Sequence, residues 1–187
     1  MYAEVKDNKI VRRVIKPRSY NNVSFGVNAT EENYIKAGLY ILVEEGTPLK
    51  YQIVDNETLD IDGNYAKVIK TFKDIKIEEA INIAIQEAKT KYLSESKRPI
   101  VKTSVGYSMD GGYEDINNLK MTYDTMEDNT IIRDAYNKVY NDISKETLGT
   151  IIRDLVNYQN SLLENKWNLE EKINNSSNVD ELRELEI

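Results

Sequence analysis

The chain has 187 residues, of which 40% are apolar and 30% are charged, and its net charge is −7. These values exclude wholesale disorder, because enough Ile, Leu, Val and Tyr are present to build a core. Cys and His are both absent, which excludes disulfides, thiol nucleophiles, zinc sites built on Cys or His, and catalysis by an imidazole base. Chemistry by carboxylates, Lys or Tyr and oxygen-ligated Mg²⁺ or Ca²⁺ stay open.

Hydropathy along the chain predicts neither a membrane span nor a signal peptide. No stretch approaches the roughly 18 consecutive apolar residues of a membrane helix. Residues 1–17 alternate charged and apolar side chains and lack the apolar centre of a signal peptide. We therefore expect a cytoplasmic protein.

The negative charge is concentrated in the C-terminal half. Residues 1–97 carry 15 Lys and Arg and 15 Asp and Glu, whereas residues 98–187 carry 10 and 17. An acidic half repels phosphate backbones, so we expect no direct contact with nucleic acid. It is typical of a solubilising surface, or of a surface that faces a basic partner such as a nucleic-acid-binding protein.

Residues 1–75 predict a small antiparallel sheet with one short helix. Two β-prone runs, 2–5 and 10–15, flank Asp7-Asn8, which favours a hairpin turn. Residues 18–26 have the composition of a loop. Thr30 is a typical helix N-cap and Gly38 a typical stop. Further strands are expected at 39–43, 50–54, 59–61 and 65–72, with a turn at Asp62-Gly63 before the last.

A long helix is expected from about Ile77 to Ser96, with Pro99 closing it. Its apolar residues recur every three or four positions. We expect this helix, within residues 76–98, to connect the N-terminal β-rich domain to a C-terminal α+β domain at 99–187.

The C-terminal part begins with an alternating run at 100–108, which predicts one strand. Asp110-Gly111-Gly112 favours a hairpin turn, residues 115–126 a helix, and residues 131–136 and 138–143 a short β pair. The last long helix starts at the Ser144 N-cap, and a short terminal helix is expected at 179–185. The predicted fold is α+β: a small N-terminal antiparallel sheet with one short helix, a central long helix, and a C-terminal β-hairpin plus a long amphipathic helix.

The long C-terminal helix carries an apolar stripe with two interpretations. Positions 148, 152, 155, 159, 162, 166, 169 and 173 hold Leu, Ile, Leu, Gln, Leu, Lys, Leu and Ile. The stripe packs either inside its own domain, against the 77–96 helix, or against a second copy as a coiled-coil seam. In the second case Gln159 and Lys166 would set the register.

Motifs for chemistry are weak throughout the chain. The segment Asp60–Asn64 resembles part of a calcium loop, but the twelfth position, which needs Glu, is Thr71. Two acidic clusters lack ligand spacing and favour solvated turns; they are Asp110, Glu114 and Asp115, and Asp124, Glu127 and Asp128. We expect no catalytic residue, no metal and no cofactor.

Aromatic and leucine side chains are the better candidates for a binding role. The chain has 13 Tyr and one Trp. Tyr suits interfaces, because it brings large contact area at low entropic cost, and it suits strand faces equally well. The expected partner-binding residues are Tyr20, Phe25, Tyr107, Tyr113, Leu155, Leu162, Trp167 and Leu169.

The opening of the chain resembles the first domain of small phage tail-fibre-associated proteins. The resemblance rests on the N-terminal hairpin, the loop Tyr20–Ser24, a short helix ending in Gly38, and the strand Leu39–Leu42. The Pro that the family carries in this strand is missing. The resemblance implies a phage or prophage protein, either staying with the virion or acting in the host cytoplasm.

The C-terminal half is similar to a domain of unknown function from phage tail regions. The matching residues are Gly106, Tyr107, Asp110, Asp115 and Asn118, followed by a hairpin, the long helix and Asp180–Leu182. The family's Trp before the hairpin has no equivalent, unless Tyr136 replaces it. Together the resemblances imply a non-enzymatic tail-fibre assembly or chaperone-like factor. The alternative is an anti-CRISPR type of protein, whose acidic half would inhibit a host defence nuclease.

Overall fold

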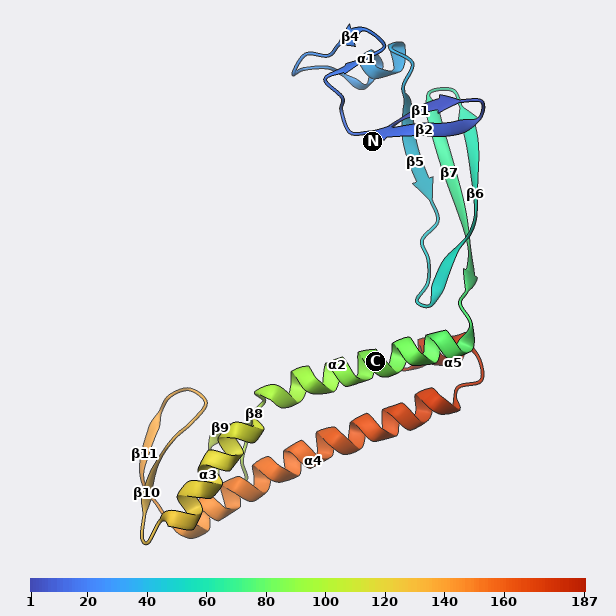
Figure 1. Ribbon diagram of the computed structural model, residues 1–187. Helices are drawn as coiled ribbons and strands as arrows, with labels where there is room; N and C mark the ends of the chain where they lie inside the picture. The colour runs from blue at the N-terminus through green and yellow to red at the C-terminus, as the bar shows by residue number, and fades with distance from the viewer. The chain divides into compact units, whose positions relative to one another are not determined.

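The computed structural model describes residues 1–187 and has an α+β fold (Figure 1). The chain divides into two compact units, Met1–Ile75 and Lys76–Ile187. Each unit has hydrophobic clusters of its own. The predicted fold class is therefore confirmed, whereas several of the finer predictions need correction.

The first unit opens with the predicted hairpin of β1 (Tyr2–Lys6) and β2 (Lys9–Val14). Its turn residues Asp7 and Asn8 have φ values of 48° and 54°, which is the left-handed pair that a two-residue hairpin turn of type I′ requires. Glu4 pairs with Arg12 and Val5 with Ile10, so Val11 is an extra residue that forms a bulge in β2.

A five-stranded sheet forms the body of this unit, in the order β2-β1-β5-β7-β6. Its other strands are β5 (Tyr40–Glu45), β6 (Gln52–Asp62) and β7 (Tyr65–Asp74). Because β6 occupies the sheet edge and β7 returns between it and β5, β5 and β7 run parallel. The predicted purely antiparallel sheet is therefore wrong. The separate strands expected at 50–54 and 59–61 are one strand, β6, with an irregularity between Val54 and Asn56.

The predicted loop at 18–26 contains a short hairpin of β3 (Ser19–Tyr20) and β4 (Val23–Ser24). Asn21 and Asn22 turn it with φ values of 46° and 60°, a conformation that Asn tolerates better than most residues. The expected short helix follows as α1 (Glu31–Lys36). The Asn33 side chain accepts a hydrogen bond from the Thr30 backbone N–H at 2.8 Å, which completes a capping box.

Two small clusters form the core of the first unit. Ala3, Leu42, Ala66 and Val68 are buried on one face of the sheet. A second cluster, largely aromatic, buries Tyr2, Tyr34 and Leu39 near α1.

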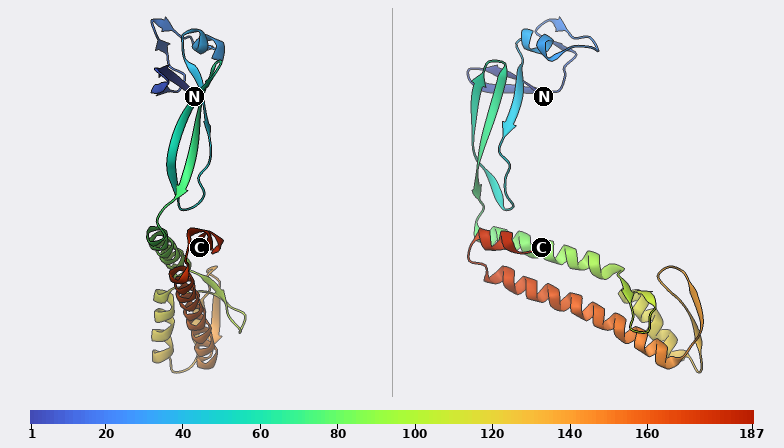
Figure 2. Two further views of the ribbon diagram at one scale, coloured as in Figure 1. Left: turned by 90° about the vertical axis from the view of Figure 1, so that its right-hand side faces the viewer. Right: turned by 180° about the vertical axis from the view of Figure 1, so that it is seen from behind.

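The second unit is built on α2 (Ile77–Lys97) and α4 (Lys145–Asn175), which lie side by side in both Figure 1 and Figure 2, with α5 (Val179–Glu184) beside α2. The α2 face contains Ala80, Ala84 and Ala88, all buried. Methyl side chains at four-residue spacing let a neighbouring backbone approach closely. The predicted helices at 77–96, 148–173 and 179–185 are confirmed.

The N-terminal part of α4 packs against smaller elements. They are β8 (Ile100–Lys102), β9 (Ser108–Asp110), α3 (Tyr113–Thr125), β10 (Thr130–Arg133) and β11 (Val139–Ile143). The single strand predicted at 100–108 is instead the β8–β9 hairpin, turned at Gly106 with a φ of 90°. The hairpin turn predicted at 110–112 is also wrong. Gly112 is the N-cap of α3, and the two glycines join β9 directly to that helix.

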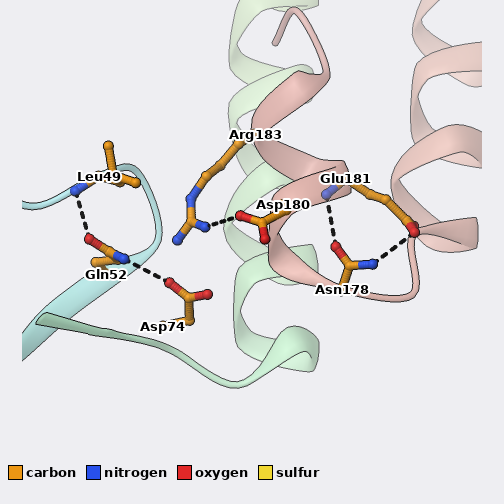
Figure 3. Close-up of polar contacts among 7 residues, drawn as sticks. All are labelled: Leu49, Gln52, Asp74, Asn178, Asp180, Glu181 and Arg183. Carbon is orange, nitrogen blue, oxygen red and sulfur yellow. Dashed lines mark hydrogen bonds and ion pairs between the residues drawn. The ribbon is translucent and has the colours of Figure 1, made fainter.

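Side-chain amides and carboxylates secure the ends of both units (Figure 3). In the first unit, Gln52 accepts from the Leu49 backbone N–H at 2.9 Å and donates to Asp74 at 3.0 Å. In the second, Asn178 caps α5 by accepting from the Glu181 backbone N–H at 3.0 Å. None of the helices combines the length and the hydropathy needed to cross a membrane.

Candidate protein-binding surfaces

The two acidic clusters do not form a metal site, because no group of three or more carboxylates is placed to hold an ion. The candidate binding surfaces are a groove on the second unit, the aromatic side chains predicted to bind a partner, and a slot in the sheet of the first unit.

The apolar stripe of α4 packs largely inside its own unit. Four of its eight positions are buried, namely Leu148, Leu155, Gln159 and Ile173. The other four are half-buried, namely Ile152, Leu162, Lys166 and Leu169. The Gln159 amide donates to the backbone carbonyls of Ser96 and Gly111, at 2.9 and 2.5 Å. Gln159 therefore links α4 by hydrogen bonds to the end of α2 and to the start of α3. These bonds explain why a polar residue occupies a buried position of the stripe.

Leu162 and Leu169 line a groove of about 300 Å³, which we call the α2–α4 groove. Ala88 and Tyr92 contribute from α2, and the rim carries two lysines and two glutamates: Lys91, Lys166, Glu95 and Glu186. The volume lies at the lower end of the range for ligand sites, roughly 300–1,000 Å³. Its mixed rim and apolar floor suit one or two side chains of a partner rather than a free metabolite.

Tyr92 organises this groove. Lys166 lies 5.8 Å from the centre of its ring, and Lys166 also pairs with Glu170 at 3.1 Å. The Tyr92 hydroxyl is 3.3 Å from that of Tyr113 on α3. The hydrogen bond with Tyr113, together with burial, raises the pKa of Tyr92. Three predicted residues, Tyr113, Leu162 and Leu169, thus gather around a tyrosine that sequence reasoning did not select.

The other predicted residues of α4 differ from one another. Leu155 is fully buried in the core with Leu148 and Ile151, so its side chain cannot present itself to a partner. Trp167 is 55% exposed and does not line the α2–α4 groove. An exposed Trp is uncommon, and Trp is among the residues most enriched at binding hot spots.

Tyr20 and Phe25 are half-buried and belong to the aromatic cluster of the first unit. The Phe25 ring lies 4.5 Å from that of Tyr34, and Tyr34 lies 4.6 Å from Tyr2. Rings at this separation stabilise each other. The two predicted residues therefore pack the β3–β4 hairpin against α1, and most of their contact area is used inside the unit.

Tyr107 is also half-buried and meets Tyr140 edge-on at 4.7 Å. The Tyr140 hydroxyl donates to the carboxylate of Asp134, which also accepts from the backbone N–H groups of Tyr136 and Lys138 at 2.9 and 2.8 Å. Burial alone would raise the pKa of Asp134, but these three donors lower it below its ordinary value. This network shapes the β10–β11 turn, so Tyr107 has a structural task.

A larger opening of about 630 Å³ lies in the first unit, and we call it the β2–β6 slot. The residues of one wall come from 8–13, which include most of β2, and those of the other from Glu57, Thr58 and Leu59 of β6. Val68 of β7 completes the lining. Since Ile10, Leu59 and Val68 all belong to the sheet's apolar cluster, the floor of the slot is apolar.

Alternating charges cross four strands beside this slot. Arg13 of β2 pairs with Glu44 of β5 at 3.2 Å, and Glu44 pairs with Lys70 of β7 at 2.8 Å. Lys70 in turn lies 3.8 Å from Glu57 of β6. Lys70, by donating to the Glu44 carboxylate, lowers the pKa of that group. The charges of Arg13 and Glu57 are therefore engaged within the sheet.

Comparisons with known proteins give no relatives for this arrangement. No family model matches the chain, no curated protein matches it, and no solved structure matches it.

Sequence reasoning overlooked the β2–β6 slot because its walls are about 45 residues apart in the chain. One signal was available. The run Lys9–Val14 carries three cations and no carboxylate on a predicted strand, which marks that strand as a basic edge. Tyr92 lies on the helix predicted at 77–96, and its hydrogen bond with Tyr113 depends on how α2 and α3 pack.

Proposed function

We propose that this chain is a non-enzymatic protein-binding factor of a phage or prophage tail region, acting in tail-fibre assembly. The resemblance of its first 42 residues to tail-fibre-associated proteins supports the biological setting. The observation that carries the binding role is the α2–α4 groove, where Leu162, Leu169 and Tyr92 remain only half-buried.

The charge of the second unit supports a basic partner. Residues 76–187 carry 14 Lys and Arg against 21 Asp and Glu, a net of −7, whereas residues 1–75 carry 11 of each. Oppositely charged surfaces steer encounter and suppress wrong partners. The favoured partner therefore offers an apolar side chain for the groove, surrounded by Lys and Arg.

Capture from phage-infected or prophage-induced cells tests this function. The bait is the full chain, and mass spectrometry identifies what it retains. We expect a tail or fibre protein bound to the wild type and to Asn168→Asp, but not to Leu169→Asp. Both variants add one carboxylate to neighbouring positions of α4, and only Leu169 lines the groove.

Circular dichroism of both variants verifies that α4 stays folded. Retention of the same fibre protein by folded Leu169→Asp would remove the groove from the proposal. If no tail or fibre protein is retained by the wild type, the assembly role itself fails.

A second function follows from the confinement of all the net charge to the second unit. An acidic helical surface could occupy the basic channel of a host defence nuclease, which is the anti-CRISPR type of inhibition. Such binding would weaken steeply as salt rises, because the Debye length falls to about 3 Å at 1 M. A defence nuclease that keeps full activity at saturating protein would end this alternative.

A further inference from the structure

The β2–β6 slot combines an unpaired strand edge with an apolar floor. β2 is the outermost strand on one side of the sheet and β6 on the other, so both expose backbone donors and acceptors outward. Such edges are ready to accept another extended chain, which is why natural proteins guard them with charges and bulges. Here β2 has both a bulge at Val11 and a row of cations.

The cations of β2 are unequal. Arg13 is neutralised by Glu44, whereas Lys9 and Arg12 have no carboxylate at ion-pair distance, and both line the slot. The one carboxylate in the lining, Glu57, already lies near Lys70. The β2 wall of the slot is therefore positive, with two charges that the unit itself leaves unpaired.

We propose that the β2–β6 slot binds an extended segment of a partner protein, with acidic and apolar side chains in alternation, which adds as a strand along β2. Its backbone pairs with the free edge of β2. Its apolar side chains, on one face, cover the half-exposed Ile10 and Leu59. Its carboxylates, on the other face, reach Lys9 or Arg12. This is strand addition, in which main-chain hydrogen bonds supply affinity and alternate side chains supply specificity.

A partner's segment fits the slot better than a second copy of this chain does. The slot has β2 on one side and β6 on the other, so it admits a single strand but not the edge of a whole sheet. Two β2 edges would also bring cations face to face, and like charges directly opposite across strands are destabilising. This site shares no residue with the α2–α4 groove, so it extends the proposed function without depending on that groove.

A labelled peptide tests the proposal directly. The probe is the heptapeptide Glu-Thr-Leu-Asp-Ile-Asp-Gly, which copies residues 57–63 and has the required alternation. Fluorescence anisotropy measures its binding to the full chain. We expect saturable binding that weakens with salt, and an at least tenfold loss for Arg12→Glu. Lys36→Glu, the same charge change in the same unit but outside the slot, should bind as the wild type does.

Two altered peptides separate strand addition from simple charge attraction. Replacing both Asp residues by Asn should weaken binding through lost charge. Methylating every backbone nitrogen keeps every side chain but removes the main-chain donors of both strand edges, and should abolish binding. Equal binding of the methylated peptide, equal binding by Arg12→Glu, or no binding at about 1 mM peptide would each overturn the proposal.

Analytical ultracentrifugation of the full chain tests whether a second copy of the chain occupies the slot. We expect the wild type to show no self-association that is lost in the Arg12→Glu variant. If the wild type self-associates and Arg12→Glu does not, the occupant is a second copy and the proposal of a partner's segment is wrong. The capture experiment separates the two sites, since loss of the fibre protein with Leu169→Asp alone concerns the groove, and loss with Arg12→Glu alone concerns the slot.

Discussion

The two units bury apolar side chains in different ways. In residues 76–187, α2 and α4 pack side by side, and Leu148, Ile151 and Leu155 are wholly inaccessible to solvent. In residues 1–75 the main sheet cluster contains two alanines among its four buried members, and Ile10 and Leu59 are only half-covered. The core of the second unit contains large side chains with no solvent exposure, whereas the core of the first unit leaves Ile10 and Leu59 half-exposed at the β2–β6 slot.

The comparison also separates two kinds of charge. The first unit has equal numbers of acids and bases, and it pairs many of them across strands. The second unit carries the whole excess of acid. Because exposed pairs contribute little to stability, we expect the charges of the first unit to govern specificity, and the apolar core of the second to govern how firmly it is folded.

The largest expected effect is at Leu155. Leu155→Ala removes a fully buried side chain and leaves a cavity, so it should lower the free energy of unfolding of the second unit by about 2–5 kcal/mol. The matched change in the first unit, Leu59→Ala at the half-covered slot, should cost less than about 1.5 kcal/mol. Urea unfolding followed by amide NMR measures both. Equal losses would contradict the contrast between a closed and an open core.

Glycine substitutions sharpen the same contrast. A Cβ on Gly112 would lie 2.6 Å from the backbone oxygen of Lys97, so Gly112→Ala should destabilise the second unit by about 1–3 kcal/mol. A Cβ on Gly26 of the first unit would meet nothing within 4 Å. We therefore expect Gly26→Ala to change thermal stability by less than about 0.5 kcal/mol. A tolerated Gly112→Ala would show that α2 and α3 are packed more loosely than described.

Gln159 offers a polar test of the second unit. Gln159→Leu keeps similar bulk but removes the amide that donates to the Ser96 and Gly111 carbonyls. Buried acceptors left without donors should lower the free energy of unfolding by about 1–3 kcal/mol. Chemical denaturation measures the loss. A more stable Gln159→Leu variant would mean that the stripe is held by its apolar residues alone.

Much of the fold was predictable because local signals were strong. Asp7-Asn8, the Ser144 cap and the helical stripes all gave elements at the expected places. The parallel pairing of β5 and β7 was not predictable, because strand order depends on contacts between distant residues. The role of Gly111-Gly112 was misread, because the same dipeptide that favours a hairpin turn also permits the close approach at the start of α3.

The candidate sites were harder to predict than the fold. Leu162 and Leu155 belong to the same stripe, yet one lines a groove and the other is sealed in the core. Periodicity shows which face of a helix is apolar but not where along that face the neighbours end. The slot depends on two strands, β2 and β6, that only the folded sheet brings together. The basic residues of β2 therefore did not by themselves indicate a binding site.

The smallest expected effect concerns titration. Asp154 accepts from the side chain and the backbone N–H of Ser104, both at 2.7 Å, and these bonds lower the pKa of its carboxyl. A lowered carboxyl pKa adds stability above the unfolded value, about 3.9 for Asp, and this contribution is lost as pH falls through the folded value. Ser104→Ala should raise the pKa of Asp154 toward the ordinary value, which NMR titration detects. An unchanged pKa would show that the backbone bond alone suffices.

Only the second unit contains a tryptophan, so the two units differ in their intrinsic fluorescence. Trp167 lies on α4 and is more than half exposed, so the emission of the folded chain should already be red-shifted and open to quenching by iodide. A ligand that covers this part of α4 should shift the emission to the blue, whereas a peptide in the β2–β6 slot should leave it unchanged. Intrinsic fluorescence therefore reports which unit a partner has engaged before any label is attached.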